Sequence, residues 1–273
     1  MKTKRVILRS VLIVAAVAAI VVIYSCSGGS SEGTPKGNKK GGKGKGDTMS
    51  LTTMIESGQT IWFEINANEE DRENVWIDLN TNGVKDEGEE VTVFGESAEY
   101  TVASPTITVY GKITKFSCGS RKISALDITG NPALEVLKCG QNMIAELDVT
   151  KNPSLKELFC QYNKITSLDL SKNKALRKMN ISQNGMKEVT AKEFPELEYM
   201  ELSQNSLGKE ALTSLFKAFP ARAEEGYSST GSVLVAEPGA SKEQNEVTPE
   251  LVQMLKDKKW KPLQREGGKN IDL

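Results

Sequence analysis

A run of oxygen-bearing side chains between residues 78 and 89 has the spacing of a calcium-binding loop. The segment DLNTNGVKDEGE matches the template D-x-[DN]-x-[DN]-G-x5-E at every specified position. Calcium is a hard cation that prefers six to eight oxygen ligands. The expected ligands are the side chains of Asp78, Asn80, Asn82, Asp86 and Glu89 and the carbonyl oxygen of Val84. The sequence therefore predicts Ca2+ as a cofactor, and the alternative is a turn rich in Asn, Asp and Gly that holds no ion.

Catalytic groups are scarce in this chain. Histidine is absent from all 273 residues, which removes His-based triads, histidine metal ligands and the commonest general base. The carboxylates of Glu157 and Glu201 remain, but neither has a recognisable catalytic partner or cofactor motif. We therefore expect a protein that is not an enzyme.

The net charge of −1 is unevenly distributed. The first nine residues contribute +4 and residues 27–48 contribute +3, which leaves −8 for residues 49–273. A mildly acidic folded part without a basic stripe does not suit a polyanion, so nucleic acid is not an expected partner.

The elements that position side chains are dominated by a repeat of 21 residues between residues 104 and 208. Four copies begin at Leu126, Leu147, Leu168 and Val189, and a degenerate copy precedes them. Apolar residues recur in three columns: Leu134, Leu155, Leu176, Leu197; Leu137, Leu158, Met179, Met200; and Cys139, Cys160, Ile181, Leu202. An asparagine follows at Asn142, Asn163, Asn184 and Asn205, where the degenerate copy has Arg121. This pattern, L-x-x-L-x-C/L-x-x-N, is that of a leucine-rich repeat.

Each copy is too short to bury its own apolar edge, so the copies must stack, with strands paired in parallel at ~4.8 Å. The buried asparagine amides are expected to cap backbone groups of the turns. The sequence predicts an α/β leucine-rich-repeat solenoid of about five rungs with a parallel sheet over residues 105–208. A small antiparallel β domain over 49–104 precedes it, and an αβ cap over 209–273 closes it.

Both flanking regions carry further predictions. Trp62 and Trp76 alternate with core positions; we expect them to pack in the core, and the alternative is a sugar-stacking platform. Strands are expected around Val75–Leu79 and Val91–Val93. In the cap we expect a helix over 208–219, a strand over 232–236 and a helix over 249–259 with Thr248 as N-cap, and the last residues should fray.

Residues that flank the central apolar column should point away from the core, onto the concave side of the sheet. Aromatic anchors among polar neighbours are typical of recognition surfaces, although one exposed aromatic needs no such explanation. The predicted ligand-binding surface consists of Lys138, Glu157, Phe159, Tyr162, Lys178, Tyr199 and Glu201.

Two columns have structural interpretations. Asp127, Asp148 and Asp169 are expected to cap the backbone of the turns that follow them. Cys118, Cys139 and Cys160 occupy a core column and are expected to be free, buried thiols.

The first 25 residues have the pattern of a lipoprotein signal peptide. A basic start is followed by an apolar run from Val11 to Tyr24 and then by Cys26, which would carry acyl chains that anchor the protein in a membrane. An ordinary cleaved signal, or a membrane anchor that is retained, is the alternative. Residues 26–48 are rich in Gly and Lys and predict a disordered tether.

The order of these parts resembles the leucine-rich-repeat surface lipoproteins of Bacteroides-type bacteria. This resemblance implies a non-catalytic binding module, lipid-anchored at the bacterial outer membrane or cell surface, that recognises a protein or host factor. The alternative function is a carbohydrate-binding accessory lipoprotein that uses exposed aromatic side chains.

Overall fold

Residues that are 21 positions apart in the sequence pair with each other on neighbouring strands of the structure. A computed structural model describes residues 46–222 and 231–273, all within one compact unit. The predicted signal peptide, the lipidation site Cys26 and nearly all of the predicted tether lie outside the described residues.

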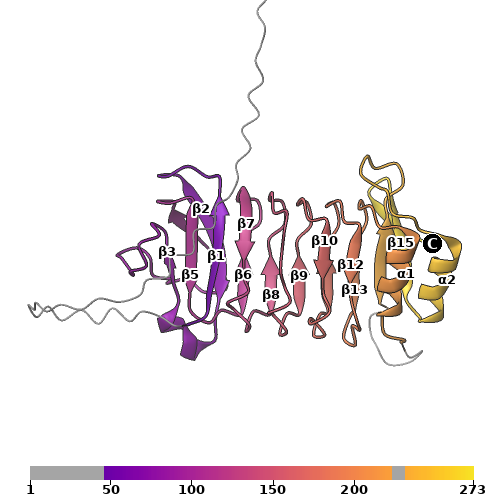
Figure 1. Ribbon diagram of the computed structural model, residues 1–273, viewed down its shortest axis with the longest axis horizontal. Helices are drawn as coiled ribbons and strands as arrows, with labels where there is room; N and C mark the ends of the chain where they lie inside the picture. Colours follow the sequence, from indigo (N-terminus) through magenta and orange to yellow (C-terminus); the bar gives the residue numbers. More distant parts are fainter. Residues whose placement is uncertain (1–45, 223–230) are drawn as a thin grey trace, which may run out of the picture. The chain divides into compact units, whose positions relative to one another are not determined.

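Five short strands form the repeat part of the main sheet and pair in parallel (Figure 1). They are β6 (Lys115–Ser117), β8 (Val136–Lys138), β9 (Glu157–Phe159), β11 (Lys178–Asn180) and β13 (Tyr199–Glu201). Their central residues Phe116, Leu137, Leu158, Met179 and Met200 pair in register, and none exposes any surface. Corresponding residues of neighbouring copies therefore lie side by side, as the repeat predicts, and the fold is of the leucine-rich-repeat type.

The main sheet extends beyond the repeats in both directions. Within the described residues it has ten strands, in the order β16-β15-β14-β13-β11-β9-β8-β6-β2-β4. On one side, β2 (Thr60–Asn66) pairs antiparallel with β6 and with β4 (Ser97–Thr101). On the other side, β14 (Ser232–Ala236) and β15 (Lys261–Glu266) continue the parallel pairing from β13. The flanking segments thus belong to the same sheet as the repeats.

A second layer covers the N-terminal part of this sheet. It has four strands in the order β3-β5-β1-β7, namely β3 (Trp76–Asp78), β5 (Thr106–Tyr110), β1 (Thr48–Thr53) and β7 (Ile123–Asp127). A short 3-10 helix, η1 (Glu69–Asn74), precedes β3, and β10 (Ser167–Asp169) pairs in parallel with β12 (Glu188–Thr190) further along. One continuous apolar core runs between the layers, so residues 49–104 do not form a domain with a separate core.

Two ladders of buried asparagines hold the rungs together. Asn163 donates from Nδ2 to the carbonyl oxygens of Cys139 and Cys160 and accepts at Oδ1 from the amide of Ile144. Asn142, Asn184 and Asn205 make equivalent bonds, which confirms the predicted backbone capping. A second ladder, Asn131, Asn152 and Asn173, is fully buried and donates to backbone carbonyls one rung earlier.

The residue before each asparagine of the first ladder adopts a left-handed conformation, and so does Ser120, which precedes Arg121 in the degenerate copy. The φ angles are 60° at Ser120, 59° at Gln141, 57° at Tyr162, 55° at Gln183 and 56° at Gln204. L-residues rarely adopt this region because Cβ approaches the following carbonyl oxygen, at a cost of roughly 1–2 kcal/mol per residue. The asparagine bonds therefore hold a turn that these side chains disfavour.

The predicted roles of the aspartate and cysteine columns are confirmed. Asp127, Asp148 and Asp169 accept from the backbone amide two residues later in each turn. Cys118, Cys139 and Cys160 are free and at most 1% exposed. Burial raises the pKa of all three thiols, to about 12 for Cys160.

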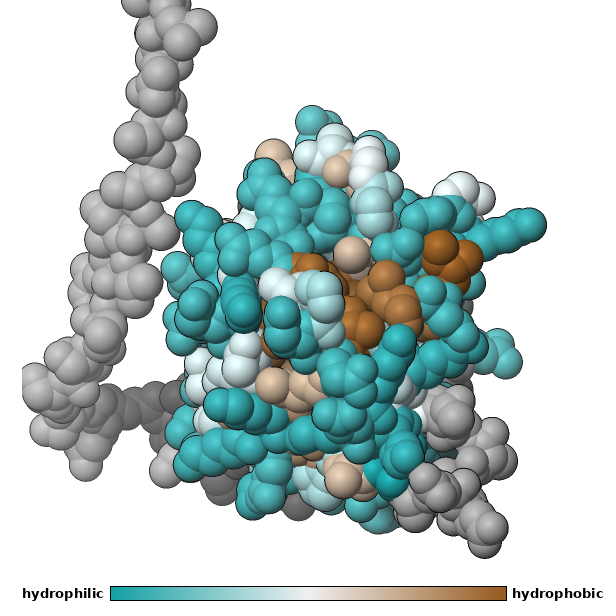
Figure 2. Space-filling view, turned by 90° about the vertical axis from the view of Figure 1, so that its right-hand side faces the viewer, coloured by the Kyte–Doolittle hydropathy of each residue, from teal (hydrophilic) through white to brown (hydrophobic). Residues whose placement is uncertain are grey.

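The C-terminal part contains α1 (Lys209–Lys217) and α2 (Pro249–Asp257). The Oγ1 of Thr248 accepts from the amide of Leu251, which confirms the predicted N-cap. The expectation that the last residues fray is wrong, because β16 (Lys269–Asp272) pairs antiparallel with β15. Gly267 and Gly268 both have positive φ and form the hairpin turn between β15 and β16. Figure 2 shows this end of the molecule, where hydrophilic side chains surround a patch of apolar surface.

Candidate functional site on the sheet face

The first and third residues of each repeat strand point away from the core and form one surface, which we call the sheet face. Six residues of the predicted ligand-binding surface lie on it: Lys138, Glu157, Phe159, Lys178, Tyr199 and Glu201. Tyr162 lies just beyond β9, in the left-handed turn, and is 46% exposed. The structure thus places the predicted residues on adjacent rungs.

Two of these residues belong to a bonded network. Glu201 is only 7% exposed, and its carboxylate accepts from the hydroxyl of Tyr199 at 2.9 Å. It also accepts from Asn180 at 3.1 Å and forms an ion pair with Arg265 of β15 at 3.2 Å. Burial and the charge of Glu201 raise the pKa of Tyr199. Tyr199 and Glu201 therefore help to join the repeats to the C-terminal strands. The other predicted residues lie outside this network and are the better candidates for contacting a ligand.

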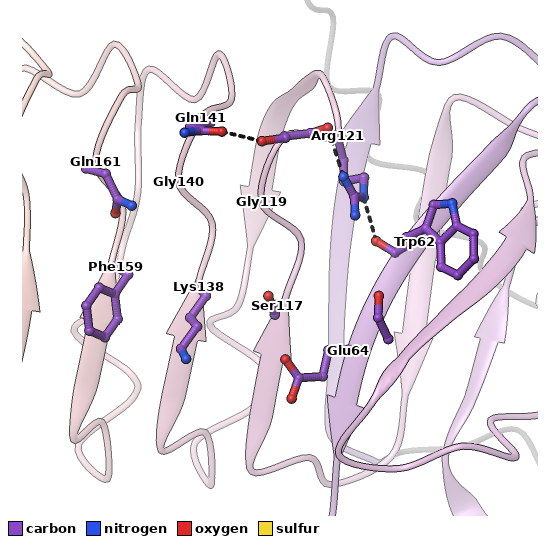
Figure 3. A pocket seen from close by; sticks show the side chains of 12 residues that line it. Trp62, Glu64, Ser117, Gly119, Arg121, Lys138, Gly140, Gln141, Phe159 and Gln161 are labelled. Atoms are coloured by element: carbon purple, nitrogen blue, oxygen red, sulfur yellow. Dashed lines mark hydrogen bonds between the residues drawn. The ribbon is translucent and has the colours of Figure 1, made fainter.

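A shallow recess of about 390 Å3 lies at the N-terminal end of the sheet face (Figure 3). Its walls come from β2, β4, β6, β8 and β9 and from the turns after β6, β8 and β9. One row across the strands reads Glu64, Ser117, Lys138, Phe159, and the next reads Trp62, Gly119, Gly140, Gln161. Ser120, Arg121 and Gln141 close the recess at the turns.

Glycine creates this recess. Gly119 and Gly140 occupy a column that Gln161, Ser182 and Ser203 fill in later rungs. A Cβ atom at Gly119 would lie 3.3 Å from the carbonyl oxygen of Gly140, and one at Gly140 would lie 2.9 Å from the side chain of Gln161. Backbone thus forms the floor, and the sequence carried the signal as two glycines in one column.

Trp62 forms one end of the recess, and the prediction that it packs in the core is wrong. Its neighbours Ile61 and Phe63 take the core side of β2, at 0% and 1% exposure. Glu64 pairs with Ser117, so Trp62 lies beside Gly119 on the sheet face and is 41% exposed. Trp76 is half-buried and stacks on Tyr110, with ring centroids 4.2 Å apart and planes 2° apart.

Two cationic side chains line the recess. Arg121 donates from Nε to the carbonyl oxygen of Trp62 at 2.8 Å and from Nη1 to that of Ser120 at 3.1 Å. Lys138 lies over the ring of Phe159, with Nζ 5.5 Å from the centroid. The one lining carboxylate, Glu64, forms an ion pair with Lys115, so the charge at the recess is net positive.

The predicted calcium loop follows β3 and is closed by its own hydrogen bonds. Asp78 and Glu89 are 2% and 3% exposed. Asp78 accepts from the amides of Asn82 and Gly83, and Glu89 accepts from those of Leu79 and Asp86. Figure 1 shows the loop beyond the main sheet, next to β3. The strand expected over Val91–Val93 does not form, and only an isolated bridge links Trp76 to Glu90.

The loop side chains converge on Asp86. Asn80 and Asn82 donate from Nδ2 to the same Oδ2 of Asp86, at 2.8 and 2.6 Å. Within residues 46–222 and 231–273, no group of three or more His, Cys, Asp or Glu side chains is placed to hold a metal ion. The expected ligand set differs from such a group, because it includes the side-chain amides of Asn80 and Asn82 and the backbone carbonyl of Val84. Calcium accepts these oxygen atoms as well as carboxylates.

No protein-family profile matches the sequence, and no curated protein is detectably similar to it. Solved structures with some likeness include the functional domain of InlJ from Listeria monocytogenes, which includes a cysteine ladder. Its identity is 28%, with a TM-score of 0.36, over 45% of this chain and 26% of that one. An internalin, InlF, from the same species is 13% identical, with a TM-score of 0.29, over 57% of this chain and 61% of that one. This chain thus matches only part of the length of either protein.

The described helices are short. No helix in residues 46–222 or 231–273 combines the length and the apolar character needed to cross a membrane.

Proposed function

We propose that this chain is a non-catalytic binding module that recognises a protein ligand through the sheet face. The observation that carries the proposal is the cluster on adjacent rungs of Phe159, Lys138, Glu157, Lys178 and the exposed Tyr162. Aromatic side chains beside charged ones are the usual anchors of protein interfaces. The asparagine ladders fix the backbone below them, so little conformational entropy is lost when a ligand binds.

Charge reversal on the sheet face tests this function. The variant with Glu157→Lys and Lys178→Glu keeps the net charge, and both side chains stand on the sheet face. In affinity capture from host-cell or bacterial surface extracts, proteins retained by the unmodified chain should be lost by this variant. A matched control exchanges the charges of Glu146 and Lys151, with Glu146→Lys and Lys151→Glu, at exposed positions away from the sheet face. Capture of the same proteins by all three forms would contradict the proposal.

Membrane attachment is the second part of the proposal. Its support is the sequence pattern that ends at Cys26, and the expected location is the bacterial outer membrane or cell surface. In cells, Cys26→Ala should release the processed protein from the membrane fraction. Processed protein that stays membrane-bound without Cys26 would rule out a lipid anchor at this residue.

A specific observation favours a second candidate, the binding of a glycan. Trp62 is 41% exposed at the end of the recess, and Phe159 lies at the other side of it. Three inter-strand spacings separate β2 from β9, which amounts to about 14 Å. This span suits a short oligosaccharide whose rings stack on aromatic faces. Loss of glycan-array binding in Trp62→Ala would support this function, and unchanged binding would contradict it.

We also propose that the loop over residues 78–89 binds Ca2+. Its support is the match of every specified motif position and the burial of Asp78 and Glu89 at the two ends of the loop. The ion would take oxygen atoms from Asp78, Asn80, Asn82, Val84, Asp86 and Glu89. Only three of these ligands carry charge, so affinity should be modest.

A further inference from the structure

The recess beside Trp62 has the chemistry of a receptor for a carboxylate. Arg121 is half-buried, and backbone carbonyls hold its Nε and Nη1. These two bonds fix the plane of the guanidinium, and its Nη2 makes no bond that the described residues record. A planar guanidinium with free N–H groups pairs well with a carboxylate. Figure 3 shows this group at the edge of the recess, between Trp62 and Gly119.

The surroundings do not neutralise this cation. Glu64 is the one carboxylate that lines the recess, and Lys115 pairs with it. Lys138, the other lining cation, contacts the ring of Phe159. The recess is thus locally positive although residues 49–273 carry −8, and an anionic ligand would meet complementary charge here.

The floor and walls favour a saccharide ring over a peptide. Each strand below the recess, β2, β6 and β8, is paired on both sides, so a peptide cannot add there as an extra strand. Its backbone groups would find few partners. A sugar ring instead presents several hydroxyl groups, which match Ser117, Ser120, Gln141 and Gln161 around the glycine floor. The exposed side chain of Trp62 adds apolar surface at the end of the recess.

We propose that this recess binds the carboxylate-bearing ring of an acidic saccharide, such as a uronic or sialic acid, with the carboxylate on Arg121. The inference rests on the glycan-binding function proposed above. The ring lies on the backbone of Gly119 and Gly140, and Trp62 packs against it.

The test is binding of the full chain, purified in detergent, to an array of uronic- and sialic-acid oligosaccharides and to their neutral methyl esters. The acidic forms should bind at least tenfold more tightly than the esters. Arg121→Gln should abolish this preference. Lys122→Gln, which makes the same charge change at an exposed neighbour, should keep it. Gly140→Ala adds a methyl group to the floor without changing charge and should weaken binding of acidic and neutral forms alike.

The outcomes separate the two proposals. Equal binding of acids and esters, or full binding by Arg121→Gln, would overturn the carboxylate assignment and leave the glycan-binding function in place. Failure of every saccharide to bind would overturn both. Binding of an acidic peptide that competes with the saccharides and is equally sensitive to Arg121→Gln would replace the saccharide with a protein ligand. Thermal unfolding of each variant checks that the fold is intact.

Discussion

Asn163 donates a hydrogen bond from Nδ2 to the carbonyl oxygen of Cys139, one rung earlier in the stack, at 3.0 Å. The same side chain also bonds Cys160 and Ile144, so one buried amide serves three backbone groups. Removal of the amide would leave the Ile144 amide without its partner in the core, while the carbonyls of Cys139 and Cys160 would keep their bonds from Asn142 and Asn184. A buried backbone group without a partner costs about 1–3 kcal/mol.

We therefore expect Asn163→Ala to lower the free energy of unfolding by roughly 1–3 kcal/mol. Chemical denaturation followed by circular dichroism measures the loss. Lys164→Ala, at the exposed next position, is the matched control and should change stability by less than about 0.5 kcal/mol. Similar losses in both variants would show that the ladder is not what holds the rungs.

The cysteine column predicts a loss of stability at high pH. Burial raises the thiol pKa, to about 12 for Cys160, above the value of 9.0 expected in the unfolded chain. Between these values the unfolded state loses the proton and the native state keeps it, so unfolding becomes more favourable as the pH rises. The stability that the protonated thiol provides is complete below pH 9 and is progressively lost up to about pH 12.

Denaturation at pH 8 and pH 10.5 should show this loss in the unmodified chain. Cys160→Val removes one of the titrating thiols and should reduce the difference between the two pH values by up to about 2 kcal/mol, at 1.36 kcal/mol per pH unit. The tyrosines of the chain remain in both forms and cancel in the comparison. An identical pH dependence in the variant would show that Cys160 does not contribute.

The left-handed turns predict a stabilising substitution. Gln183 has a φ of 55°, and its backbone amide donates to Ser203. Gly adopts this conformation without the Cβ contact, so Gln183→Gly should raise the unfolding free energy by about 0.5–1 kcal/mol. Gln183→Val places a branched side chain in the same region and should lower it. Thermal unfolding of the two variants must move in opposite directions, and a shift of both in one direction would refute the explanation.

The proposed calcium loop predicts a ligand-dependent rise in stability. An ion that binds only the native state stabilises it by RT ln(1 + [L]/Kd), about 2.7 kcal/mol at a hundredfold excess over Kd. Millimolar Ca2+ should raise the melting temperature of the unmodified chain and leave Glu89→Gln unchanged. Mg2+ serves as the ion control. Calorimetry that detects no Ca2+ uptake by the unmodified chain would exclude the site.

The repeat part was predictable because its signals are local and recur. A fixed period placed Leu137 and Leu158 side by side, and the buried polar column required Asn163 to bond the backbone. Thr248 and Pro249 likewise predicted where α2 begins. These features depend on residues that are near in sequence or separated by one period.

The Trp62 end of the recess was not predictable because it depends on the pairing of β2 with β6, which no repeat encodes. Alternation places Trp62 on the strand face opposite Ile61 and Phe63, but it does not show whether another part of the chain covers that face. The pairing of β2 with β6 decides it and brings Trp62 beside Gly119. The ion pair of Arg265 with Glu201 joins residues far apart in the sequence. No repeated pattern in the sequence predicts it.

The hydrogen bonds of each asparagine reach one rung back and no further. Excision of residues 147–167 would join Glu146 to Leu168 and would offer each remaining rung a neighbour with equivalent bonding groups. The sheet face would then lose Glu157 and Phe159 together, and the recess would lose the side that Phe159 forms. The hydrogen bonds between neighbouring rungs would stay the same. The binding surface of such a protein can thus change by the gain or loss of whole copies, at little risk to folding.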